Sequence, residues 1–233
     1  MLPAGGSATA RVTGPSGFDQ TVALPGVLTD LRVGEYTVTP LPFEVSNVDF
    51  AGFEMFEAAP NLVTVTASST ATADIDYSYS GLRLPDDPSD ANVYALDEAD
   101  ELTEIRTTLT TTSLLVMVEM ATNIDPARFT GIVDFDLDQS SLTGENTDGT
   151  FEFCSVVAPS FGKDLQLNWY VGGNAQIFYP DADGPVVDMS ISGAVATFTI
   201  PLGAISGDGR VNAAAVVGHL DAPTDCSFGQ AGV

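Results

Sequence analysis

Apolar and polar residues alternate along most of this chain with a period of two, not the period of about 3.6 that an amphipathic helix requires. Near residue 65, for example, Val63, Val65 and Ala67 fall on one face, and Thr64 and Thr66 fall on the other. Alternation of this kind, with abundant Thr and Val between Gly, Pro and Asp turns, is typical of strands that bury one face. We therefore predict an all-β protein of two antiparallel sandwich domains.

The first predicted domain spans residues 1–81 and has short strands separated by frequent turns. Gly14-Pro-Ser-Gly17 has turn chemistry and separates the first two strands. Short strands with frequent turns predict a small sandwich. The expected strands are Ala8–Thr13, Gln20–Leu24, Gly34–Pro40, Leu62–Ala67 and Thr70–Tyr79.

An acidic, Pro-rich stretch over residues 82–91 is predicted to link this domain to a second one at 92–233. The second domain carries nine expected strands and hairpin turns, and this predicts a larger jelly-roll-like sandwich. The strands are Leu102–Leu109, Ser113–Ala121, Thr130–Leu137, Thr150–Val157, Asp164–Val171, Ala175–Tyr179, Pro185–Ser190, Ala194–Pro201 and Arg210–His219.

Three stretches of the first domain resemble immunoglobulin-like or prealbumin-like repeats of large bacterial exoproteins. They begin at Ala10 (ARVTGPSGF), Leu31 (LRVGEYTVT) and Val63 (VTVTASSTATA). In those repeats a leucine–glycine–tyrosine–valine pattern, matched here by Leu31, Gly34, Tyr36 and Val38, forms a core strand with the tyrosine inside. The resemblance implies a sandwich fold and an exported setting, and it names no ligand.

Stretches of the second domain resemble DOMON-like sandwiches and the related family-nine carbohydrate-binding modules of secreted bacterial enzymes. They are Asp86-Asp-Pro-Ser-Asp-Ala, Leu114-Leu-Val-Met-Val, Gly131-Ile-Val-Asp-Phe-Asp-Leu-Asp with Leu142-Thr-Gly, and Phe198-Thr-Ile-Pro-Leu. The resemblance implies a recognition domain whose relatives bind sugars or haem or have no known ligand. No motif here matches a haem axial ligand, so haem is not carried over.

The charge narrows the choice of partners. The chain has 32 Asp and Glu against 7 Lys and Arg, for a formal charge of −25, and Lys163 is the single lysine. Such a field repels nucleic acid and anionic lipid surfaces and favours cations, calcium above all through its preference for oxygen ligands. Solubility, or a salty exterior, is the alternative explanation. No apolar run reaches the roughly 18 residues of a membrane-spanning helix.

Cys154 and Cys226 are the two cysteines, and a disulfide between them is the simplest pairing in an exported protein. Two buried free thiols are the alternative. The opening residues, Met1-Leu-Pro-Ala, have neither the basic nor the apolar region of a signal peptide. We therefore expect a piece of a longer bacterial protein that works outside the cell or at its surface.

The best local candidate for a metal site is an acidic strand end followed by a loop. Asp134, Asp136 and Asp138 share one face of the predicted strand about 7 Å apart, and Glu145 follows in the loop. The spacing mimics an EF-hand, but Gln139 stands where that loop needs glycine. We predict a calcium site at this strand end, with a solvated acidic face as the alternative. In a second acidic loop, which contains Asp181, Asp183 and Gly184, we expect a plain turn, with calcium ligation by the two carboxylates as the alternative.

Trp169 and Tyr170 are the candidate ligand-binding residues, because a pyranose ring stacks on an exposed aromatic ring. As neighbours on a strand they point to opposite faces, so packing in the core is the alternative for one of them.

Catalysis has little support in the sequence. His219 is the single histidine, and no nucleophile elbow, zinc ligand set or phosphate loop is present. We therefore expect a non-catalytic structural or recognition module that calcium stabilises, with polysaccharide or other surface proteins as partners. A calcium-dependent carbohydrate-binding module is the alternative. A glycoside hydrolase using two carboxylates is the third possibility.

Overall fold

The computed structural model describes residues 6–47, 52–86, 101–140, 142–145, 162–205, 208–219 and 222–227. The chain divides into two compact units, one of residues 1–45 and 54–80 and one of residues 46–53 and 81–233. Strands dominate both units, and within each unit the described strands pair in antiparallel fashion. The predicted all-β class is therefore confirmed. None of the helical turns in the described ranges is long and apolar enough to cross a membrane.

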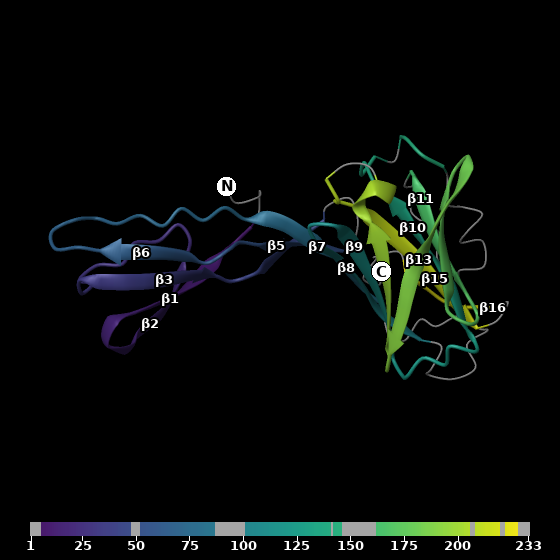
Figure 1. The fold of residues 1–233 in the computed structure, drawn as a ribbon, viewed down its shortest axis with the longest axis horizontal. Coiled ribbons are helices and arrows are strands. Elements are labelled where there is room, and N and C mark those ends of the chain that lie inside the picture. The colour runs from purple at the N-terminus through teal and green to yellow at the C-terminus, as the bar shows by residue number, and fades with distance from the viewer. Residues whose placement is uncertain are drawn as a thin grey trace. The chain divides into compact units, whose positions relative to one another are not determined.

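The first unit is built on a four-stranded sheet with the order β2-β1-β3-β6 (Figure 1). Its inward side chains form a core of Ala10, Val12, Tyr36 and Val38, in which Val12 and Val38 are paired across strands. The strands are β1 (Thr9–Gly14), β2 (Phe18–Ala23), β3 (Gly34–Pro40) and β6 (Asn61–Val65), and the helical turn η1 (Pro15–Gly17) joins the first two.

A second group of buried side chains lies at one end of this unit. Phe43 stacks on Phe56 with ring centroids 5.4 Å apart and meets the edge of Tyr77 at 4.8 Å. The Tyr77 hydroxyl lies 3.0 Å from the Leu41 carbonyl oxygen and 3.2 Å from that of Thr9, so it joins two chain segments. Strands β4 (Phe43–Ser46), β5 (Phe53–Glu57) and the start of β7 (Ser78–Pro85) frame this group.

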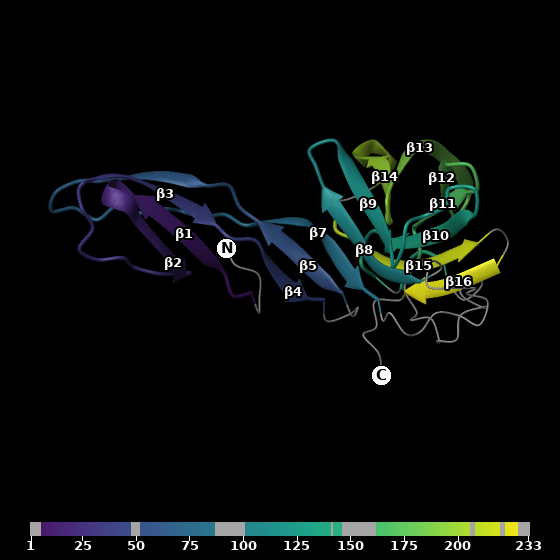
Figure 2. The ribbon, with the colours of Figure 1, turned by 90° about the horizontal axis from the view of Figure 1, so that it is seen from below.

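The second unit is a curled antiparallel sheet whose strands run in the order β16-β15-β10-β11-β12-β13-β14-β9-β8-β7. The eleven-residue β13 pairs with β12 through its first half and with β14 through its second, so it passes from one layer of the sandwich to the other. Figure 2 shows the strands closing around one interior. Their bounds are β8 (Leu102–Leu109), β9 (Ser113–Met120), β10 (Phe129–Asp136), β11 (Leu165–Tyr170), β12 (Asn174–Tyr179), β13 (Ala182–Ser192), β14 (Val195–Pro201), β15 (Asn212–His219) and β16 (Ala222–Ser227), with the turn η3 (Leu202–Ala204) after β14.

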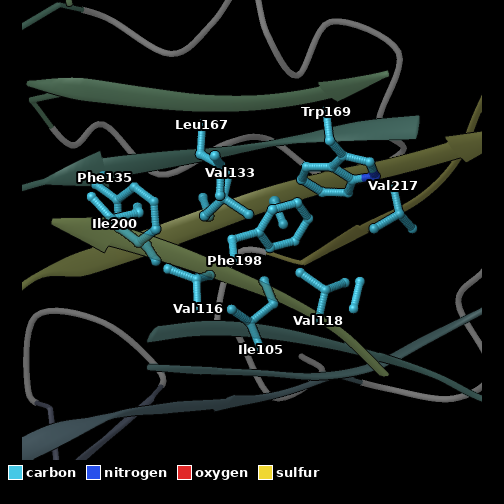
Figure 3. Close-up of a cluster of buried hydrophobic side chains, with 14 of the residues drawn as sticks. Ile105, Val116, Val118, Val133, Phe135, Leu167, Trp169, Phe198, Ile200 and Val217 are labelled. Carbon is cyan, nitrogen blue, oxygen red and sulfur yellow. The ribbon is translucent and has the colours of Figure 1, made fainter. Parts of the chain in front are cut away.

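The core of this unit is apolar and closely interdigitated. Trp169 of β11 contacts Phe198, with ring centroids 5.0 Å apart (Figure 3). On another side the indole contacts Phe129 of β10, with ring centroids 5.3 Å apart. Val133 and Phe135 of β10 point into the same core and are almost completely buried. Alternation along β10 therefore sends Asp134 and Asp136 to the other face of the layer.

The boundary between the units differs from the predicted linker at 82–91. Residues 82–85 belong to β7, and Leu82 and Leu84 are completely buried in the core of the second unit. The acidic, Pro-rich composition did not indicate a strand at residues 82–85, because only Leu82 and Leu84 supply apolar side chains to the inward face there. Residues 87–91 lie outside the described ranges.

The predicted disulfide is described at one end only. Cys226 is 7% exposed on β16, whereas Cys154 and the expected strand Thr150–Val157 lie outside the described residues. The Cys154–Cys226 pairing stays a prediction.

Candidate cation site

The outward face at the end of β10 is acidic and is nevertheless buried. Asp134 and Asp136 are 0% and 1% exposed, so the alternative of a fully solvated acidic face does not describe these two residues. Ionised carboxylates removed from water need hydrogen-bond donors or cations nearby. The two side chains meet this need differently.

Asp136 joins Asp138 and Asp164 in one cluster. One carboxylate oxygen from each residue lies within 4.8 Å of the other two. Asp164 is held there by the backbone: its N–H donates to the Phe135 carbonyl oxygen at 2.9 Å, and its Oδ2 accepts from the Leu137 N–H at 2.9 Å. The junction between β10 and the start of β11 thus brings together acids that are 28 positions apart in sequence.

The loop after β10 orients Asp138 toward this cluster. Gln139 has φ +54°, which lies in the left-handed region. The Ser140 N–H then donates to Asp136 Oδ1 at 3.1 Å and to Asp138 Oδ1 at 3.0 Å. Thr143 Oγ1 donates to Asp138 at 2.8 Å. At the position where an EF-hand loop has glycine, this chain thus has a glutamine in the left-handed region, three residues after the end of β10.

The electrostatics of the cluster are unfavourable without a cation. Burial raises the pKa of Asp136, and the hydrogen bond from Asn212 Nδ2 to Asp136 Oδ2, at 3.1 Å, opposes this only in part. At an effective dielectric constant of about 20, two carboxylates 4.8 Å apart repel by about 3 kcal/mol. A divalent cation would reverse the sign of this interaction, and calcium, whose ligands lie about 2.3–2.6 Å away, tolerates oxygens at this separation.

A second layer of amides supports Asp136. Asn212 is 3% exposed on β15, directly opposite Asp136 in the strand register. Asn47 Nδ2 donates to Asn212 Oδ1 at 2.9 Å, which fixes the amide so that its Nδ2 faces the carboxylate. Groups that orient a ligand in this way commonly surround metal sites.

Two of the four predicted metal ligands lie elsewhere. Asp134 Oδ1 accepts a hydrogen bond from Gln166 Nε2 at 2.7 Å, and Glu145 forms an ion pair with Lys163 at 3.2 Å. Asp164 was missed by the sequence, because its place depends on the pairing of β10 with β11 across a long connection. A lone Asp at the start of a strand was the only local signal.

A second acidic group was also missed. Asp86, Glu101 and Asp225 place carboxylate oxygens within 4.8 Å of one another. Asp225 is 1% exposed, and its two oxygens accept the N–H groups of Leu102 and Cys226, both at 2.7 Å. The described residues therefore include two clusters that could hold a metal ion, and Asp225 in this one already serves the backbone.

The two candidate aromatic residues, Trp169 and Tyr170, point to opposite faces of β11, as neighbours on a strand do. Trp169 is completely buried, and its ring therefore offers no face to a sugar, whereas Tyr170 is 48% exposed. Tyr170 lines an open hollow of about 300 Å³ with Gln166 and Asn168. Asn168 Oδ1 has no hydrogen-bond partner among the residues that the structure describes. The rest of the lining comprises Glu145, Lys163, Leu165, Phe178, Tyr179 and Pro180.

His219 is half-buried on β15, and its Nε2 accepts a hydrogen bond from Arg128 Nε at 2.7 Å. His219 Nδ1 lies 3.0 Å from Arg128 Nη2, so both ring nitrogens contact the same guanidinium group.

No protein-family model matches the chain, and no curated protein matches it in sequence.

Proposed function

We propose that this chain is a non-catalytic structural or recognition module of a bacterial exoprotein, and that calcium stabilises its larger sandwich. The carrying observation is the Asp136–Asp138–Asp164 cluster, whose oxygens lie within 4.8 Å of one another at the junction of β10 and β11. A cation there would tie the end of a core strand to the loop after it and to the start of the next strand. The net charge of −25 adds a long-range attraction for cations.

This cluster is preferred over Asp86–Glu101–Asp225 for two reasons. Asp138 is exposed and Asp164 is half-buried, so a hydrated ion can approach and exchange water for carboxylate oxygens. In the other cluster Glu101 and Asp225 are 7% and 1% exposed, and Asp225 is engaged with two backbone N–H groups. Calcium is preferred over zinc because every candidate ligand is a hard oxygen.

The test is thermal unfolding in EDTA and in millimolar calcium, for the wild type and for Asp138→Asn. We expect calcium to raise the melting temperature of the wild type and to leave Asp138→Asn nearly unchanged. Asp188→Asn, which removes an exposed acid of β13 outside both clusters, is the matched control and should respond like the wild type. Equal responses of all three proteins would mean that calcium acts only through the overall charge.

Carbohydrate binding is the second candidate function, and the hollow beside Tyr170 favours it. An exposed aromatic ring at the rim of a hollow that two amide side chains also line combines a stacking surface with polar groups, as sugar sites do. Electrophoresis in gels containing polysaccharide tests this role: retardation should be lost in Tyr170→Ala. It should persist in Val186→Ala, which truncates an exposed side chain outside the hollow. Absence of retardation in every polysaccharide would remove this candidate.

A further inference from the structure

The segment Thr70–Ile75 of the first unit has the character of a strand but is not part of a sheet. Its side chains alternate, with Thr70, Thr72 and Asp74 exposed and Ala71, Ala73 and Ile75 partly buried. Ala73 and Ile75 pack against the core of the four-stranded sheet. In the part of the chain that the structure describes, no backbone–backbone hydrogen bond reaches residues 70–75. In Figure 1 it is a plain extended line beside β6.

The hydrogen-bonding groups of this segment divide into two sets. In extended chain the N–H and C=O of one residue point to one side, and those of the next residue point to the other. The Asp74 carbonyl oxygen accepts the Asn61 Nδ2 at 3.0 Å, so the set containing Thr72 and Asp74 faces β6. The set of Ala71, Ala73 and Ile75 therefore faces away from β6, and we call this set the outer edge of the segment.

We propose that this outer edge accepts an extended strand of another polypeptide, with its backbone bonded to Ala71, Ala73 and Ile75. An exposed row of unpaired N–H and C=O groups on a pre-extended chain is the usual template for strand addition. The segment is held in place by its partly buried side chains. Tyr77, two residues after the segment, also fixes the chain there, because its hydroxyl donates to the Leu41 carbonyl oxygen. Little conformational entropy is then lost on the acceptor side.

The exposed side chains define the chemistry of the partner. Asp74 projects from the same face as Thr70 and Thr72 and gives that face a negative charge. The basic residues of this unit, Arg11 and Arg32, bond to Asp19 and Ser16. Opposite charges across neighbouring strands stabilise a pair, and like charges oppose it. The fitting partner is a strand with Lys or Arg on the exposed face and small or β-branched apolar residues on the other. A second copy, with a charge of −25, is disfavoured.

The probe is a capped, fluorescently labelled seven-residue peptide of alternating valine and lysine, added to the full chain in EDTA so that the cation site plays no part. Fluorescence anisotropy measures binding, and amide hydrogen exchange measures protection of residues 71, 73 and 75. The same peptide with alternate amides methylated keeps its charge but cannot complete the ladder, and a valine–glutamate peptide reverses the charge. We expect binding and slowed exchange with the first peptide alone.

Two variants sharpen the result. Asp74→Asn should weaken binding up to about fivefold, the value that corresponds to one cross-strand charge pair, whereas Asp30→Asn elsewhere in the unit should not. Equal binding of the methylated peptide would overturn the proposal, because attraction to the net charge would then suffice. Slow exchange at residues 71–75 without peptide, together with a dimer in sedimentation, would also overturn it and identify a second copy as the occupant.

Discussion

Replacing Gly131 by alanine is predicted to destabilise the second unit, although alanine is smaller than every other side chain on the inner face of β10. Gly131 pairs with Trp169 of β11, and the indole covers it. A Cβ atom at residue 131 would meet Trp169 Cζ2 at a distance that real carbon contacts do not reach, and it would lie 2.6 Å from the Val216 carbonyl oxygen. The indole cannot move aside freely, because Phe129 and Phe198 hold it.

The magnitude follows from two opposing effects. Overpacking a closed core costs about 1–3 kcal/mol of unfolding free energy. A glycine-to-alanine change also restricts the unfolded chain and recovers about 0.4–1 kcal/mol. We therefore expect a net loss of about 1–2 kcal/mol. The melting temperature should fall by about 2–4 °C for each kcal/mol lost in a protein of this size.

Urea unfolding followed by tryptophan fluorescence is the assay. Trp169 is the single tryptophan and is fully buried, so its emission reports the second unit alone. Gly203→Ala is the matched control, because an added Cβ there has no heavy atom within 4 Å. If Gly131→Ala proved as stable as Gly203→Ala, the packing of the indole over Gly131 would be refuted. That result would also argue against the assignment of alternate β10 residues to opposite faces of the strand, and the cation site depends on this assignment.

Three further predictions concern single groups. Burial raises the pKa of Asp136, so in EDTA the protonated carboxyl contributes its full stability below about pH 4, and this stability is lost as the pH rises through the raised pKa. Urea unfolding from pH 4 to 8 should therefore show the free energy of unfolding of the wild type falling relative to that of Asp136→Asn. A difference between the two proteins that stays constant with pH would contradict this. Asp225→Ala strips acceptors from two backbone N–H groups and should cost about 2–5 kcal/mol, with Asp225→Asn milder because one oxygen can still accept; two equally stable variants would argue against those bonds. Burial also raises the pKa of Tyr77, so the first unit of the wild type should lose stability above about pH 10, where the unfolded chain ionises more readily than the folded one. In Tyr77→Phe the first unit should be less stable by about 1 kcal/mol at neutral pH, because the hydrogen bond to the Leu41 carbonyl oxygen is lost, and it should show no such alkaline loss; hydrogen exchange of the first unit measures both effects.

The sequence predicted those features that depend on local alternation. The inward placement of Val133 and Phe135, and the opposite placement of Asp134 and Asp136, follow from a period of two on β10. The burial of those acids could not be predicted, because it depends on which strands flank β10. Asn212 and Asp164 reach Asp136 only through pairing with β15 and β11.

The alternation of apolar and polar residues also could not predict whether a strand pairs with a neighbouring strand. The stretch from Thr70 to Tyr79 alternates as predicted, yet only its end, from Ser78, enters a sheet. Pairing requires another chain segment at the right distance, and neither composition nor period encodes that. For the same reason Trp169 and Tyr170 could be assigned to opposite faces but not to the core or the surface.

Calcium titration by calorimetry, at fixed ionic strength, tests the central claim most directly. The wild type and Asp225→Asn should each show saturable heat from binding at the Asp136–Asp138–Asp164 cluster, and Asp138→Asn should show none. Saturable binding that Asp138→Asn retains and Asp225→Asn loses would move the ion to the other cluster. No saturable heat in the wild type would contradict the proposal that calcium stabilises this module.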